Sequence, residues 1–104
     1  MYHLNEYQVQ AAETRLESAT TDYLFLGLAG EAGELLGLRA KAIRDGRKFD
    51  YDLNIKKKLG DVLWFVAQLA TDHGMTLEEI ANANIHKLKD RQQRNQLQGS
   101  GDNR

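Results

Sequence analysis

The sequence predicts an all-α protein, a four-helix bundle-type subunit completed by oligomerisation. There is no proline among the 104 residues, against an average usage of about 5%, which favours long uninterrupted helices. Two central stretches are apolar around most of a helix circumference, more than one small bundle can cover. No strand pattern, internal repeat or linker stands out, so residues 1–104 are predicted to form a single domain.

Composition narrows the function classes. A net charge of −1 argues against a general nucleic-acid binder, which is normally basic. Without cysteine the chain has neither disulfides nor a thiolate metal site. No apolar run approaches the roughly 18 residues of a membrane span, and the first ten residues lack a signal-peptide pattern. We therefore expect a cytoplasmic protein with no nucleic-acid or membrane partner.

The first two helices are bounded by capping signals. Asn5 followed by Gln8 is typical of a capping box, which predicts a first helix from there to about Leu16. After a polar connection at 17–20, a cap at Thr21 or Asp22 opens the second helix. That helix is predicted to end near residue 44, because an Asp-Gly pair follows.

The other two helices are also predicted from capping and stop signals. The third is predicted from about Asp52 until His73-Gly74, where glycine suits a helix end. Thr76-Leu77-Glu78-Glu79 is a capping box ahead of an apolar run, which predicts a fourth helix over 77–96.

Two carboxylates occupy the second predicted helix where apolar residues are expected. Glu31 and Glu34 are three residues apart and share a helix face. The apolar stripe that contains the first and borders the second consists of Leu24, Leu28, Leu35 and Leu38. Both acids are therefore expected to point toward the core, where ionised carboxylates are rare unless they are paired or bind a metal.

Glycines interrupt the same helix at Gly27, Gly30, Gly33 and Gly37, and each costs about 1 kcal/mol relative to alanine. The last three fall on a face next to Glu34, which predicts close approach of another backbone or a bulky ligand. A tight helix crossing, with the two glutamates in buried salt bridges, remains the alternative.

The third predicted helix carries Lys58 and Asp61 on one face, again three residues apart. An acid on a buried helix face, opposite a helix with two buried acids, is how metal sites in bundle cores are assembled. Hard carboxylate oxygens favour Mg²⁺ or Mn²⁺, and Mg²⁺ is typically shared with substrate phosphates.

The fourth predicted helix places polar residues on its apolar stripe. Asn84 and Arg91 lie on the stripe and Lys87 on its shoulder. Together they present an amide and two cations, which suits an anion such as those phosphates. For Arg91 the alternative is a helix end that emerges from the bundle.

Several stretches resemble the MazG-like nucleoside triphosphate pyrophosphohydrolases, and the likeness covers essentially the whole chain. The resemblance implies an all-α dimer or tetramer that uses Mg²⁺ to hydrolyse (deoxy)nucleoside triphosphates to monophosphate and pyrophosphate. The family motif is ExxE followed some two dozen residues later by ExxD. The matching stretches are Gly27-Leu28-Ala29-Gly30-Glu31-Ala32-Gly33-Glu34, Leu59-Gly60-Asp61-Val62-Leu63-Trp64, Asn84-Ile85-His86-Lys87-Leu88, Glu6-Tyr7-Gln8 and Gly99-Ser100-Gly101-Asp102-Asn103-Arg104.

Under this resemblance the motif acids have metal-binding and catalytic roles, and one of them, such as Glu34, is a general base. The fourth-helix cluster faces the phosphates. Trp64 and Phe65 are candidates for an aromatic wall beside the base or sugar, although core packing suits Phe65 better. Residues 99–104, ordinarily a mobile tail, are predicted to close over the nucleotide. The resulting candidates are Glu31, Glu34, Asp61, Trp64, Asn84, Lys87, Arg91 and Arg104.

One position departs from the motif, because Lys58 stands where the third acid is expected. A complete quartet carries −4, whereas three acids and one lysine carry −2, which suits one divalent ion better than two. Protonated lysine cannot ligate metal, so Lys58 is expected to pair with Glu31 or Glu34, contact a phosphate, or extend away. The alternative function is a catalytically impaired nucleotide-binding or oligomeric interaction protein on the same fold.

Overall fold

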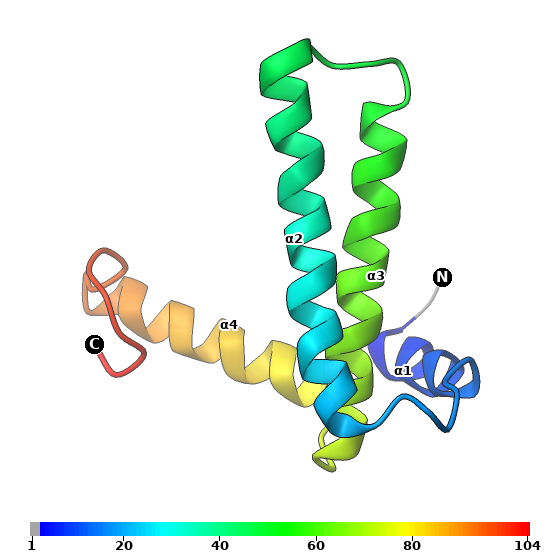
Figure 1. The fold of residues 1–104 in the computed structure, drawn as a ribbon. Helices are drawn as coiled ribbons and strands as arrows, with labels where there is room; N and C mark the ends of the chain where they lie inside the picture. Colours follow the sequence, from blue (N-terminus) through cyan, green and yellow to red (C-terminus); the bar gives the residue numbers. More distant parts are fainter. Residues whose placement is uncertain (1–2) are drawn as a thin grey trace.

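A computed structural model of the protein describes residues 3–104 and confirms the all-α prediction, because this part of the chain contains four helices and no strand. The helices are α1 (Leu4–Glu13), α2 (Thr21–Asp45), α3 (Tyr51–Asp72) and α4 (Leu77–Gln93). Helices α2 and α3 form a long antiparallel hairpin (Figure 1). Helix α1 packs against α3, and α4 packs against α1 and extends away from the hairpin. A single chain therefore does not close a four-helix bundle.

The predicted boundaries of the hairpin helices hold to within one residue or two. Thr20, one residue before the expected positions, caps α2, and its hydroxyl accepts a hydrogen bond from the Tyr23 amide at 3.3 Å. Gly46 ends α2 with a φ of 86°, and Gly74 follows α3 with a φ of 68°, so both predicted stop signals are confirmed.

The capping box predicted for α1 is wrong. The helix begins at Leu4 after His3 and ends at Glu13, three residues before the expected end. Asn5 and Gln8 bind the first turn of α4 instead of their own helix. The Asn5 side-chain oxygen accepts from the Glu78 amide at 3.1 Å, and that of Gln8 accepts from the Leu77 amide at 2.7 Å.

Gln8 also ties α1 to the end of α3, because its side-chain amide donates to the Thr71 hydroxyl at 3.0 Å and to the Met75 carbonyl at 2.9 Å. The capping box at the start of α4 is confirmed. The Thr76 hydroxyl accepts from the Glu79 amide, and the Glu79 carboxylate accepts from the Thr76 amide. The direction of α4 is thus set by side chains of α1, and the helix ends at Gln93 rather than at residue 96.

Two small apolar clusters form the core. One contains Ala11, Ala67, Ala70 and Leu77, and the other contains Ala19, Leu24 and Phe65. Trp64 packs against both, and its indole N–H donates to the Thr14 hydroxyl at 2.8 Å. Phe65 is buried and lies edge-on to Trp64 with ring centroids 5.0 Å apart, which confirms its packing role.

A charged clamp holds the connection between α1 and α2 against the end of α3. The Arg15 guanidinium donates to both carboxylate oxygens of Asp72, at 2.6 and 3.0 Å, and to the Ala19 carbonyl. The Thr21 hydroxyl donates to the same carboxylate at 2.7 Å. Hydrogen bonding by Arg15, and then by Thr21, lowers the pKa of Asp72 below its usual range.

The close approach of α2 and α3 occurs at a single glycine of α2. A side-chain carbon at Gly27 would collide with the Phe65 ring, whereas no atom of residues 3–104 outside the local backbone lies within 4 Å of such a carbon at Gly30, Gly33 or Gly37. The prediction of close approach at these three glycines is therefore wrong within one chain. Their face is left open for a ligand or another chain.

We predict that Gly27→Ala lowers the free energy of unfolding by roughly 1–3 kcal/mol, because the buried Phe65 ring must move. Gly30→Ala is the matched control and should raise it by up to about 1 kcal/mol, because alanine favours helix and meets nothing. Urea unfolding measures both. A loss of stability in Gly30→Ala would mean that another chain packs on that face.

Gln68 on α3 is fully buried, and neither side-chain amide atom has a hydrogen-bond partner within residues 3–104. An unsatisfied buried amide costs free energy that an apolar side chain of similar volume avoids.

We therefore predict that Gln68→Met raises the free energy of unfolding by about 1–2 kcal/mol, as measured by urea unfolding. The exposed Gln93→Met is the control and should change it by less than about 0.5 kcal/mol. Destabilisation by Gln68→Met would instead mean that the amide is satisfied by water or by another molecule in solution.

Helices α2 and α3 leave many large apolar side chains exposed, as expected for helices too apolar for one small bundle. These residues are Tyr23, Phe25, Leu26, Leu36, Ile43, Leu53, Leu59 and Leu63. In the part of the chain that the structure describes, no helix combines the length and apolar character needed to cross a membrane.

Candidate functional site

The contact between Gly27 and Phe65 sets the register in which the predicted site residues meet. Glu31 lies one turn after Gly27 on α2, and Asp61 lies one turn before Phe65 on α3. Because the helices are antiparallel, both steps lead in the same direction along the hairpin. A further turn brings Glu34 and Lys58 to the same region.

Three carboxylates converge on the Lys58 ammonium. Its nitrogen lies 2.5 Å from a Glu34 oxygen, 3.2 Å from a Glu31 oxygen and 3.5 Å from an Asp61 oxygen. We call Glu31, Glu34 and Asp61 the acidic cluster. The structure thus brings together the three predicted acids and the predicted lysine. Of the alternatives for Lys58, it confirms pairing with the glutamates and adds Asp61 as a partner.

The acidic cluster is more open to solvent than the sequence predicted. The Glu31 side chain is 24% exposed, but those of Glu34 and Asp61 are 59% and 50% exposed. The expectation that both glutamates point into the core is therefore wrong for Glu34. The reason is that α1 packs against α3 and α4 packs against α1, so neither of these helices covers Glu34 on α2. The alternative interpretation predicted that both glutamates form buried salt bridges. They do form salt bridges, with Lys58, but these are partly exposed.

Proximity to Lys58 stabilises the charged forms of the groups around it. Hydrogen bonding and charge from Lys58 lower the pKa of Glu34 below its usual range. Hydrogen bonding to Glu34, and then to Glu31, raises the pKa of Lys58 far above its usual range. Lys58 therefore remains an ammonium at physiological pH.

The donors of the acidic cluster suit a hard divalent cation, because three carboxylates of two helices surround one positive charge. Within residues 3–104, however, no three acidic or histidine side chains already stand close enough together to hold a metal ion. The carboxylates are spread around the ammonium of Lys58 instead. Carboxylates are suitable ligands for Mg²⁺ or Mn²⁺, but in this structure their spacing fits the ammonium of Lys58.

Tyr7 of α1 is a neighbour of the site that was not among the predicted site residues. Burial, with a smaller contribution from the Asp61 charge, raises the pKa of its phenol. The signal available in the sequence was its place in the Glu6-Tyr7-Gln8 stretch that resembles the family.

The predicted phosphate-binding residues of α4 are not brought to the acidic cluster within one chain. Asn84 is exposed on a helix that extends away from the hairpin (Figure 1). The Lys87 ammonium lies 3.2 Å from an Asp102 carboxylate oxygen. Arg91 is only 4% exposed, and its guanidinium donates to the Asp102 carbonyl at 2.6 Å. Arg91 is therefore covered by the end of the chain instead of emerging from a bundle.

The tail at 99–104 folds back on the end of α4. The Arg104 guanidinium donates to the carbonyls of Gly101 at 2.6 Å, Leu97 at 3.0 Å and Gln96 at 3.2 Å. The Arg94 guanidinium donates to the Arg104 carbonyl at 2.8 Å. In this arrangement Arg104 binds backbone carbonyls of residues 96, 97 and 101.

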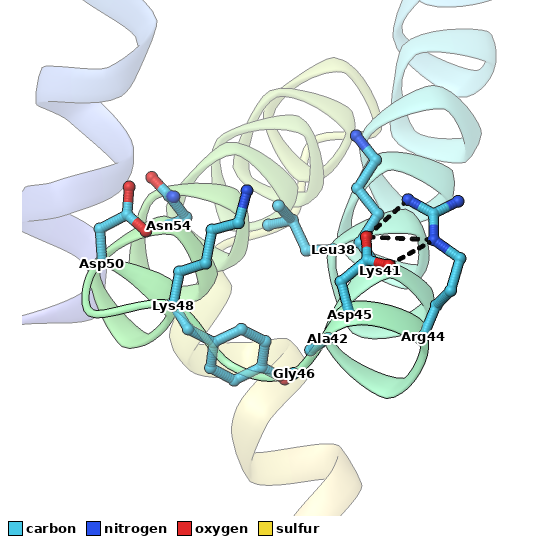
Figure 2. Close-up of a pocket in the computed structure, with 10 residues that line it drawn as sticks. Leu38, Lys41, Ala42, Arg44, Asp45, Gly46, Lys48, Asp50 and Asn54 are labelled. Carbon is cyan, nitrogen blue, oxygen red and sulfur yellow. Dashed lines mark hydrogen bonds and ion pairs between the residues drawn. The ribbon is translucent and has the colours of Figure 1, made fainter.

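A separate pocket of about 390 Å³ lies at the closed end of the hairpin (Figure 2). Lys41, Arg44 and Lys48 line it together with two acids, and Arg44 is paired with Asp45 at 2.8 Å. None of the predicted site residues lines this pocket.

Comparison with known proteins identifies the family of this chain. The MazG nucleotide pyrophosphohydrolase domain matches residues 19–95, which include α2, α3 and α4. The chain therefore belongs to the MazG nucleotide pyrophosphohydrolase family. It is also 36% identical over 113 aligned residues to the Gene 37 protein of Mycobacterium phage L5, covering 98% of this chain and 99% of that protein. No solved structure gave a significant match.

Proposed function

We propose that the protein hydrolyses (deoxy)nucleoside triphosphates to the monophosphate and pyrophosphate in a Mg²⁺-dependent reaction. Family membership supports this class of reaction. The observation that carries the proposal is the convergence of three carboxylates on one cationic atom between α2 and α3. Such a cluster binds cations, and a triphosphate needs a bound cation to neutralise its negative charge.

In this proposal Glu31 and Asp61 hold the ion from opposite helices. When bound, a divalent ion polarises the phosphoryl oxygens and lowers the pKa of an attacking water. Glu34 is the most exposed carboxylate of the acidic cluster, so it is accessible as a general base that takes the proton of that water. Water attacks the α-phosphorus, and pyrophosphate leaves.

Association into a dimer or tetramer forms part of the proposal. The exposed large apolar side chains of α2 and α3 support it, because contact with another chain would remove them from water. We further propose that the protein acts in the cytoplasm, where nucleoside triphosphates are found.

The alternative is a nucleotide-binding protein on the same fold with little or no catalysis. Lys58 favours it, because an ammonium already neutralises part of the charge that would attract a metal ion. Pyrophosphate release distinguishes the two functions.

We predict that the protein with a nucleoside triphosphate and Mg²⁺ releases pyrophosphate and not orthophosphate. Glu31→Gln and Asp61→Asn should each lower kcat/KM by about 100-fold or more, because each removes one charged ligand of the ion. The exposed Glu17→Gln is the matched control and should retain the rate.

Pyrophosphate and nucleoside monophosphate are quantified separately across a panel of ribo- and deoxyribonucleotides. A nucleotide-dependent rise in Tm without pyrophosphate release would select the alternative function. No response to any nucleotide would exclude both.

The tail contacts generate another prediction about nucleotide binding. If Lys87 and Arg91 bind phosphates, the Asp102 carboxylate competes with the nucleotide for them. Asp102→Asn should then tighten binding of a nucleoside triphosphate by about 3- to 10-fold in calorimetry at low salt.

Deletion of residues 99–104 removes Arg104 as well, so the truncated protein should bind more weakly than Asp102→Asn if the tail closes over the nucleotide. Its Tm should change little, because the tail packs only on an exposed helix end. Unchanged affinity in Asp102→Asn would remove these two cations from the proposed site.

A further inference from the structure

The position of Lys58 is not explained by the local preferences of α3. Lys56, Lys57 and Lys58 form a run in the first half of α3, and the helical preference of lysine is the same at all three positions. Lys58 nevertheless has a side chain only 29% exposed, folded between two helices. Its neighbour Lys57 is exposed. What distinguishes Lys58 is its contact with the acidic cluster.

The contacts of Lys58 use the same atoms that a metal ion would use. An ammonium donates three hydrogen bonds and has no lone pair. Each of the three carboxylates lies within 3.5 Å of the Lys58 nitrogen through one oxygen. Glu31 and Glu34 accept hydrogen bonds from the ammonium and Asp61 forms an ion pair with it, so an ion cannot take the same place while the ammonium is there.

We propose that Lys58 is a built-in competitor of the divalent cation: its ammonium occupies the centre of the acidic cluster, and an ion binds there only after displacing it. This inference deepens the proposed function and rests on its assignment of the acidic cluster as the metal site. The displaced side chain remains attached one turn before Asp61, beside the place where an anionic substrate would bind.

The net charge of the site predicts how Lys58 changes the stability of the metal-free protein and its affinity for Mg²⁺. With Lys58 in place the four side chains carry a net charge of −2, and without it the carboxylates carry −3. The metal-free protein should therefore be more stable with Lys58, because the ammonium relieves repulsion between the carboxylates. The same contact should weaken the affinity for Mg²⁺.

The experiment compares wild type, Lys58→Met and the matched control Lys57→Met without nucleotide, at constant ionic strength. Calorimetric titration with MgCl₂ measures affinity, and thermal unfolding with EDTA measures stability of the metal-free protein. Lys58→Met should bind Mg²⁺ about tenfold more tightly. Its metal-free Tm should fall by about 4 °C and rise more steeply with added Mg²⁺. Lys57→Met should match wild type in both measurements.

Lys58→Glu provides a second test, because it should bind more Mg²⁺ ions per chain than wild type. If the variants fail to fold, the ¹³Cε resonance of Lys58 in wild type should shift as MgCl₂ is added. Equal affinity in wild type and Lys58→Met would overturn the proposal, as would loss of Mg²⁺ binding in Lys58→Met or an unshifted resonance. Because no nucleotide is present, these outcomes are independent of whether wild type releases pyrophosphate.

Discussion

The packing of the Phe65 ring against the backbone at Gly27 is the contact on which the rest of the arrangement depends. No other residue type leaves room for the ring at that point. The contact brings two antiparallel helices to a fixed separation and register. One helical turn further along, side chains as short as aspartate and glutamate then reach the same ammonium from opposite helices. The chemistry of the site is thus a consequence of a packing contact made by an apolar ring.

Much of the fold follows from local signals, because helix ends are determined within a few residues. The Thr76 capping box and the glycines at 46 and 74 act on their own backbone, and the structure has them as expected. Asn5 and Gln8 show the limit of this reasoning. Their spacing suits a local cap, but an amide side chain serves any nearby backbone group equally well. The partner that it finds lies about 70 residues away.

In the candidate site, too, some features follow from local sequence and others depend on distant contacts. Spacing along a helix identifies which side chains share a face, so the three acids and Lys58 could be placed together in advance. Spacing does not reveal what covers that face. Glu34 is largely exposed, and Lys87 is carried by α4, whose direction leads away from the hairpin (Figure 1). That direction is set by Asn5 and Gln8, whose sequence context contains no information about it.

The attachment of α4 through α1 affects the order in which parts of the chain fold. The α2–α3 hairpin is joined by residues 46–50, whereas the Asn5 contacts with α4 span 73 positions. Closing the longer loop costs more chain entropy, and few hydrogen bonds offset that cost. The hairpin, with the acidic cluster already assembled, can therefore form before the two ends of the chain meet. We therefore expect the orientation of α4 to become fixed last and to be lost first when stability falls.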